Sequence, residues 1–218
     1  MNLQSIRRYR SRLSRTSGLL KNNPVVGLGL TLPFVIVPTL SLKSGLMISA
    51  FLAVATIPSA ILASVWGRRI QPIFALPCYG IVSMAFVLLL RWYCAGQALL
   101  LENLGVYLPL CAFNGMMLEL SLLHPRKKPL QALHDSVMMC IGFLLVAAFL
   151  SAGRELLGTG TLWGIPVAAP IRISGLTLPF AGFILIGFLS ALFRRLDGII
   201  VGRMLRASRR GAKEGGEG

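Results

Sequence analysis

Six long apolar runs, nearly free of charged residues, constrain the fold of this chain more than any other feature. A helix needs about 20 apolar residues, and at least about 17, to cross the roughly 30 Å of hydrocarbon in a bilayer. Six stretches reach that length: residues 24–41, 45–65, 73–90, 104–123, 136–153 and 176–193. Charged residues make up 13% of the sequence, against about 25% in soluble domains. The sequence therefore predicts an all-α integral membrane protein with six transmembrane helices in a lipid bilayer.

The distribution of basic residues predicts the orientation of these helices. The formal net charge is +15, and the Lys and Arg residues lie mainly in four alternate segments: the N-terminal segment, the loops after the second and fourth runs, and the C-terminal tail. The positive-inside rule places those segments, and so both termini, in the cytoplasm. On a soluble chain this charge would suggest nucleic acid, but here it flanks membrane runs, and no nucleic-acid partner is expected.

The same distribution divides the chain into three parts. Residues 1–23 form a basic cytoplasmic segment, residues 24–195 form the six-span membrane domain, and residues 196–218 form a basic tail. The tail ends in a stretch of Gly, Glu, Lys and Arg without large apolar residues, so it is predicted to be disordered.

A short motif repeats in the first and fourth runs. Leu28–Pro33 and Leu104–Pro109 both read Leu-Gly-x-x-Leu-Pro. The first run would point outward and the fourth inward, so the pair predicts an inverted 3+3 repeat like those of transporters. Gly175–Phe180 repeats Gly29–Phe34 letter for letter, which breaks this symmetry and leaves shared membrane composition as an alternative reading.

The prolines of this motif predict that the first and fourth helices are broken. A proline inside a span bends the helix, and irregular backbone at membrane depth persists only where protein buries it or where it lines a cavity. Pro33 and Pro109 therefore indicate either a site near the pseudo-two-fold axis or ordinary kinks that shape the packing.

Few residues in the runs could carry chemistry. Glu119 is the one acidic residue inside a predicted span, which makes it an ion-path candidate, although it also lies close enough to the cytoplasmic end to reach water or Arg126. The four cysteines are scattered and are read as small buried residues: Cys78, Cys94, Cys111 and Cys140. No nucleophile motif, phosphate loop or metal-ligand spacing is present, so no catalytic residue, no metal site and no self-contained enzyme are predicted.

Several segments resemble one membrane-protein family. Ser151–Gly164 contains Arg154-Glu155 followed by Gly158 and Gly160, and it is similar to a Ser-x-Arg-Glu-Ile-Ile-Gly-x-Gly-Thr-Leu-Phe-Gly stretch. Residues 104–114, ending in Asn114, resemble Leu-Gly-x-x-x-Pro-Leu-x-x-x-Asn-Cys, and residues 21–24 and 130–135 also resemble family segments. The stretches that they resemble belong to the small membrane subunits of the Rnf and Nqr complexes, and the resemblance is to the RnfE/NqrD type.

The resemblance implies a role in electron transport. It implies six spans with both ends cytoplasmic, a homologous partner subunit of opposite orientation, and a place among the other subunits of a complex in the bacterial inner membrane. It also implies a [2Fe-2S] cluster held inside the membrane by cysteines at the helix breaks of the two subunits. In such complexes electron transfer is coupled to movement of Na+ or H+.

This sequence departs from the family pattern at the cluster ligands. Where the family has its first cysteine this chain has Leu32, or Thr31 if a gap is placed, and where the family has its second it has Gly115. An iron–sulfur cluster needs thiolate ligands. Cys111, one helical turn before Gly115, is conceivable as a shifted ligand but has no counterpart in the first run. We therefore expect no cluster to be ligated by this chain.

The Arg154-Glu155 pair is the best-matched part of the motif. Neighbouring residues on a helix do not face one another, so the two side chains are expected to bind elsewhere in the bundle or on a partner subunit. Snorkelling of Arg154 to the interface is the alternative.

The sequence thus predicts a noncatalytic scaffold or ion-path subunit of an Rnf/Nqr-like complex. A stand-alone transporter, or an assembly protein built on the same fold, is the alternative.

Overall fold

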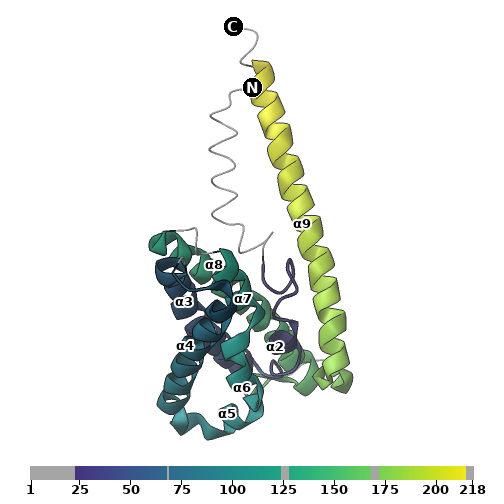
Figure 1. Cartoon of the computed structure of the whole chain (residues 1–218). Coiled ribbons are helices and arrows are strands. Elements are labelled where there is room, and N and C mark those ends of the chain that lie inside the picture. The colour runs from purple at the N-terminus through teal and green to yellow at the C-terminus, as the bar shows by residue number, and fades with distance from the viewer. Residues whose placement is uncertain (1–22, 68, 124–127, 168–171, 215–218) are drawn as a thin grey trace.

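The computed structural model describes residues 23–67, 69–123, 128–167 and 172–214, and this part of the chain is mostly helical (Figure 1). The longer helices are α3 (Leu42–Trp66), α4 (Pro72–Tyr93), α8 (Pro129–Arg154) and α9 (Pro179–Glu214). The shorter α-helices are α2 (Leu32–Ile36), α5 (Ala98–Leu104), α6 (Tyr107–Leu110) and α7 (Gly115–Leu123). Short helical segments link them: the 3-10 helices η1 (Ala95–Gln97), η2 (Cys111–Phe113) and η5 (Ser174–Thr177), and the π-helix η4 (Glu155–Thr159). The strands β1 (Thr161–Leu162) and β2 (Ile165–Pro166) form a hairpin.

Three of the six predicted runs are confirmed as long apolar helices. Within the described residues, Leu42–Trp66, Ile73–Tyr93 and Pro129–Thr159 are long and apolar enough to cross a membrane. Ala95–Leu104 and Tyr107–Glu119 would together make a fourth, but they meet at an angle of 84°. The first run, residues 24–41, holds only the five-residue helix α2.

Helices α3 and α8 form the centre of the bundle. They approach closely where Gly45 faces Ser151, because a methyl group added at Gly45 would lie 2.5 Å from Ser151 Oγ. Small residues at a helix contact let two backbones approach closely, which is how helices associate within a bilayer. Helix α4 packs on the other side of α3 and leaves large apolar side chains such as Ile73, Ile81 and Leu89 exposed, as expected of a surface that faces lipid.

Helix α9 runs along the opposite side of the molecule (Figure 1). It contacts α2, where a methyl group added at Gly182 would lie 3.1 Å from Ile36 Cγ2. The helix starts three residues later than the predicted sixth run and continues to Glu214, through most of the segment predicted to be a disordered tail. Arg, a good helix former, is the most frequent residue in that continuation, and no proline interrupts it. The N-terminal residues 1–22, the tail residues 215–218 and Arg126 lie outside the described residues.

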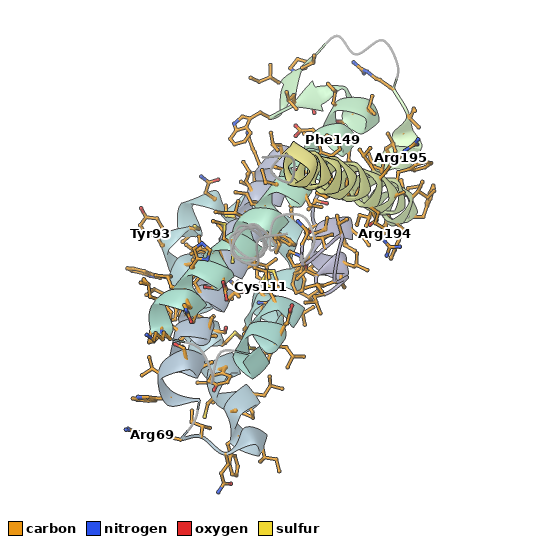
Figure 2. All side chains as sticks on the ribbon, turned by 90° about the horizontal axis from the view of Figure 1, so that it is seen from above. Arg69, Tyr93, Cys111, Phe149, Arg194 and Arg195 are labelled. Atoms are coloured by element: carbon orange, nitrogen blue, oxygen red, sulfur yellow. The ribbon has the colours of Figure 1, made fainter. Side chains whose placement is uncertain are left out.

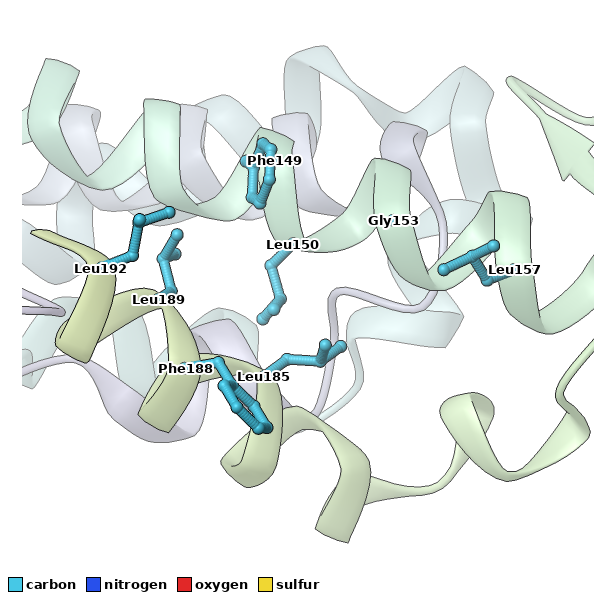
Figure 3. Close-up of a pocket in the computed structure, with 8 residues that line it drawn as sticks. All are labelled: Phe149, Leu150, Gly153, Leu157, Leu185, Phe188, Leu189 and Leu192. Atoms are coloured by element: carbon cyan, nitrogen blue, oxygen red, sulfur yellow. The ribbon is translucent and has the colours of Figure 1, made fainter.

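A purely apolar groove separates α8 from α9. It has a volume of about 340 Å³ and is lined by residues of both helices and of η4, including Phe149, Leu150, Leu185 and Phe188 (Figure 3). No polar side chain lines it, so it offers no ligand for an ion.

Candidate functional site

Asn23 organises the first apolar run. Its Oδ1 accepts hydrogen bonds from the backbone N–H groups of Val25 and Val26, at 3.0 and 3.1 Å, and folds the chain into a turn. Its Nδ2 donates to the carbonyl of Gly142, in the middle of α8, at 2.9 Å. Pro33 then lies at the start of α2. Proline is well tolerated at a helix start because its missing N–H would have no partner there. Pro33 therefore begins a short helix within the run.

The fourth run is broken on both sides of Pro109. Gly105, with a φ of +46°, separates α5 from the following residues, a backbone conformation that glycine adopts without strain. Pro109 lies inside the short helix α6, and Asn114, in an extended conformation with φ −88° and ψ 157°, separates η2 from α7. The breaks thus fall at Gly105 and Asn114, several residues from the proline.

Asn114 holds its break in place. Its Oδ1 accepts a hydrogen bond from the N–H of Met117 at 2.8 Å, which caps the start of α7. Its Nδ2 donates to the carbonyl of Cys111 at 2.7 Å and to Thr56 Oγ1 of α3 at 3.2 Å. Asparagine is among the preferred N-cap residues, so this break carries a sequence signal that the proline obscures. A buried asparagine thus binds each broken run to a long helix of the other half of the chain: Asn23 binds α8, and Asn114 binds α3.

The two breaks meet directly. A methyl group added at Gly115 would lie 2.5 Å from the carbonyl oxygen of Leu30 and 2.9 Å from its Cβ, so the two backbones are in contact there. Thr31, next in the chain, is fully buried, and its Oγ1 has no hydrogen-bond partner among the described residues. We call the contact between Leu30 and Gly115, together with Thr31 and Leu32, which follow Leu30 in the chain, the junction.

The junction unites the positions that the family resemblance assigns to cluster ligands. The groups present there are the aliphatic side chain of Leu32, the hydroxyl of Thr31 and the bare backbone of Gly115. A cysteine Cβ at position 115 would collide with Leu30. The residues of the junction do not fit an iron–sulfur cluster, because they supply no thiolate and leave no room for one at position 115.

Cys111 lies inside the bundle rather than at its surface. It is fully buried among apolar side chains, whereas Arg69 and Tyr93 lie at the edge of the molecule (Figure 2). Within the described residues, no three His, Cys, Asp or Glu side chains gather closely enough to hold a metal ion. Cys111 is therefore placed as a core residue behind the junction.

Buried hydroxyl groups also lie between α3 and α4. Ser59 Oγ and Ser83 Oγ lie 2.7 Å apart, and Ser83 Oγ donates to the carbonyl of Ala55 at 2.6 Å. Tyr79 Oη, also buried, has no hydrogen-bond partner in the part of the chain that the structure describes. Glu119 lies on α7, partly buried. Sequence reasoning missed the serines and Tyr79, because hydroxyl residues are common in membrane helices and show no distinctive spacing.

Arg154 joins three segments at the far end of α8. Its side chain is 1% exposed, and it donates to backbone carbonyls on both sides. Nη1 bonds the carbonyl of Ile36 in α2, and Nε bonds the carbonyl of Leu176 at 3.0 Å. Nη2 bonds the carbonyls of Thr177 and Leu178 at 3.2 and 3.3 Å. Arg154 therefore donates hydrogen bonds to backbone carbonyls near the end of the first run and just before α9.

Glu155 points the other way and binds backbone N–H groups. Its Oε2 accepts from the N–H of Leu42, the first residue of α3, at 2.7 Å. Its Oε1 accepts from the N–H of Gly164 at 2.8 Å, in the β1–β2 hairpin. Gly158 packs on Thr177, where an added methyl group would lie 3.1 Å from Cγ2, and Gly160 ends η4 with a φ of +71°. The motif Arg154–Gly160 is thus a connector of four segments.

Long apolar helices with two runs broken inside the bundle define this chain as a polytopic membrane protein with broken helices. The chain belongs to the Rnf-Nqr subunit family of membrane proteins, whose model matches residues 13–200. The resemblance seen in the sequence is therefore confirmed.

Similar proteins are the E subunits of ion-translocating oxidoreductase complexes from Shewanella species. The protein from Shewanella loihica is 31% identical over 202 residues, which cover 83% of this chain and 85% of that protein. The protein from Shewanella piezotolerans is 31% identical over 205 residues, covering 85% of this chain and 88% of that protein. The protein from Shewanella sp. strain ANA-3 is 35% identical over 153 residues, covering 67% and 64%.

Proposed function

We propose that this chain is a membrane subunit of an ion-translocating oxidoreductase complex, in which it acts as a scaffold or ion-path subunit and carries no redox centre. Membership of the Rnf-Nqr family and similarity to proteins named as the E subunits of such complexes support the first part. The second part rests on the junction.

The closed contact between Leu30 and Gly115 is the observation that carries the proposal. At the place where the family resemblance implies cluster ligands, one broken run packs on the other through backbone and aliphatic groups. Such packing stabilises the two breaks against one another without a metal, because irregular backbone at membrane depth has to be buried in protein. Cys111 offers no substitute, since a thiol that is fully buried in this chain does not reach a surface shared with a partner.

We further propose six spans arranged as an inverted repeat, with both termini in the cytoplasm of a bacterium whose inner membrane holds the complex. The crosswise bonds support the repeat: Asn23, immediately before the first run, binds α8, and Asn114 of the fourth run binds α3. A homologous subunit of opposite orientation is the proposed partner.

Labelling of single cysteines tests this topology in a chain whose own four cysteines are replaced by serine. Lys128 and Arg172 are both exposed and lie near opposite ends of α8. A membrane-impermeant maleimide added outside should label the Arg172→Cys chain and spare the Lys128→Cys chain. The reverse pattern would contradict the orientation, and labelling of both would contradict the number of spans between them.

A stand-alone transporter is the second candidate function. The unpartnered hydroxyl of Thr31 at the junction favours it, because broken helices in transporters coordinate ions at their unwound segments.

Isolation of the chain from its native membranes distinguishes the two functions. An affinity tag is added to the C-terminus at the chromosomal locus, and membranes are solubilised in mild detergent. We expect subunits that contain flavin and iron–sulfur groups to co-purify in fixed stoichiometry. Recovery of the chain alone, together with ion uptake by proteoliposomes that contain only this chain, would establish the transporter instead.

A further inference from the structure

The β1–β2 hairpin carries a tryptophan in an unfavourable backbone conformation. Leu162 pairs with Ile165, so Trp163 and Gly164 form a two-residue turn, with φ values of +61° and +80°. Positive φ at both positions is the type I′ geometry, which favours Asn-Gly because a larger side chain crowds the backbone. Trp163 is the one residue other than glycine with a positive φ in the described part of the chain. A side chain retained at such a position suggests a role outside local folding.

The hairpin presents an apolar surface to its surroundings. Trp163 is 47% exposed and Ile165 is 64% exposed, and Leu162 and Val167 are exposed beside them. The side chains belong to a rigid element, because Val167 N–H also bonds the carbonyl of Gly160 at 2.9 Å and extends the pairing. The exposed apolar surface is therefore held in a fixed shape.

The hairpin lies at the level where two membrane helices end. One candidate span begins at Leu42 and another ends at Thr159, two residues before the hairpin. Glu155 ties these points together, since its carboxylate binds the N–H of Leu42 and the N–H of Gly164. Where these two candidate spans cross the bilayer, this position places the hairpin at the boundary between hydrocarbon and headgroups, where tryptophan is enriched in membrane proteins.

Two cations lie near the hairpin. Lys43 Nζ lies 5.9 Å from the centre of the Trp163 ring, in position for a cation–π contact. Arg172 is exposed, and a methyl group added at Gly160 would lie 2.6 Å from its Nε. Glu155 is 3% exposed and directed at backbone N–H groups, so it does not cover this positive surface. Among the described residues, no carboxylate lies within salt-bridge distance of Lys43 or Arg172.

We propose that residues 161–167, with Lys43 and Arg172, form a binding site for anionic phospholipid at the bilayer surface. Trp163 and Ile165 enter the edge of the hydrocarbon, and the two cations bind the phosphate groups of the lipid headgroups. A combination of aromatic, aliphatic and basic side chains at this depth matches a charged lipid surface in both its apolar and its anionic parts. The site anchors the ends of α3 and α8 to one leaflet, independently of whether a partner subunit is present.

Fluorescence of Trp163 in bilayers of known composition tests this site. The full-length chain with Trp66→Phe and Trp92→Phe retains Trp163 as its single tryptophan. It is reconstituted into two bilayers of phosphatidylcholine and phosphatidylglycerol. In one bilayer the phosphatidylcholine, and in the other the phosphatidylglycerol, carries bromine atoms near the headgroup end of its acyl chains, where they quench tryptophan on contact. The ratio of quenching by the two brominated lipids measures how far the anionic lipid is enriched around Trp163.

We expect both brominated lipids to quench Trp163, with phosphatidylglycerol enriched around it about fivefold or more. An enrichment of about fivefold corresponds to the attraction of one surface cation to an anionic membrane. The Lys43→Gln/Arg172→Gln variant should lower the ratio to equality, and Arg172→Gln, a change at an exposed residue, should lower it part of the way. Lys128→Gln, which removes an exposed cation at the other end of α8, should leave the ratio unchanged.

Two results would overturn the proposal. Equal quenching by the two lipids in the otherwise native chain would show a hairpin that touches the bilayer without selecting anionic lipid. Absence of lipid quenching, with quenching by iodide in the water phase, would show a hairpin directed at solvent and available to a protein partner.

Discussion

Replacement of Arg154 is the sharpest test of how the bundle is held together. Arg154→Met keeps a long apolar side chain but removes every donor, so the carbonyls of Ile36 and Leu176 lose the guanidinium that now binds them. A hydrogen bond from a charged group contributes about 1.5–3 kcal/mol. The two shortest of the four bonds to backbone carbonyls described above give roughly 3–6 kcal/mol. The cost of burying the charge, which the substitution relieves, is subtracted from this sum.

We therefore expect Arg154→Met to lower the free energy of unfolding by about 3 kcal/mol. For a chain of this length, a loss of that size corresponds to a fall in Tm of roughly 6–12 °C. Arg154→Lys should recover only part of this, because an ammonium group does not reach carbonyls on two sides as a planar guanidinium does.

The buried cysteines provide the assay. Cys111 and Cys140 are buried, so a thiol-reactive dye reports unfolding of the detergent-solubilised chain once Cys78 and Cys94 are replaced by serine. If Arg154 instead snorkels to the interface, its charge alone matters, and Arg154→Lys would melt at the temperature of the parent chain. That result, or an unchanged Tm in Arg154→Met, would refute the reasoning.

Three further predictions use the same melting assay or hydrogen exchange. Gly115→Ala should destabilise the chain by about 1–3 kcal/mol because its methyl group meets Leu30, while Gly153→Ala, with open space around it, should not. Asn114→Ala should cost about 1 kcal/mol or more by removing the cap of α7, whereas the exposed Asn103→Ala should leave the Tm unchanged. Glu155→Gln should speed hydrogen exchange at the N–H groups of Leu42 and Gly164. Unchanged exchange at both would show that the carboxylate does not hold them.

The long helices could be predicted from the sequence because length and hydropathy decide them. The second, third and fifth runs appear as α3, α4 and α8, within a few residues at most ends. The first run could not be assigned so simply, because its composition is as apolar as theirs. There a single side chain, Asn23, folds the backbone into a turn by binding it and α8 at once.

The breaks illustrate the same limit. Proline marks the repeated motif, yet Pro33 starts a helix and Pro109 lies within one, because proline fits the first turn of a helix as well as it disrupts the interior. The breaks themselves depend on Gly105 and Asn114, both of which stand in the segments that carry the family resemblance.

The partners of Arg154 and Glu155 lie beyond any sequence pattern. Their spacing predicts partners elsewhere in the bundle, and in the structure those partners are backbone groups distant in sequence, such as Ile36 and Leu42. Every residue carries the same backbone groups, so the sequence does not indicate which of them a side chain binds, and only the fold reveals it.

The proposal that this chain carries no redox centre is tested most directly on the complex isolated from native membranes. Iron content and the electron paramagnetic resonance spectrum of the reduced complex are compared between the native chain and a variant with all four cysteines replaced by serine, with Cys111→Ser alone as a second variant. We predict that all three preparations have the same iron content and the same electron paramagnetic resonance spectrum, because none of the four cysteines binds iron. Loss of a [2Fe-2S] signal in Cys111→Ser would contradict the proposal and identify that thiol as a cluster ligand.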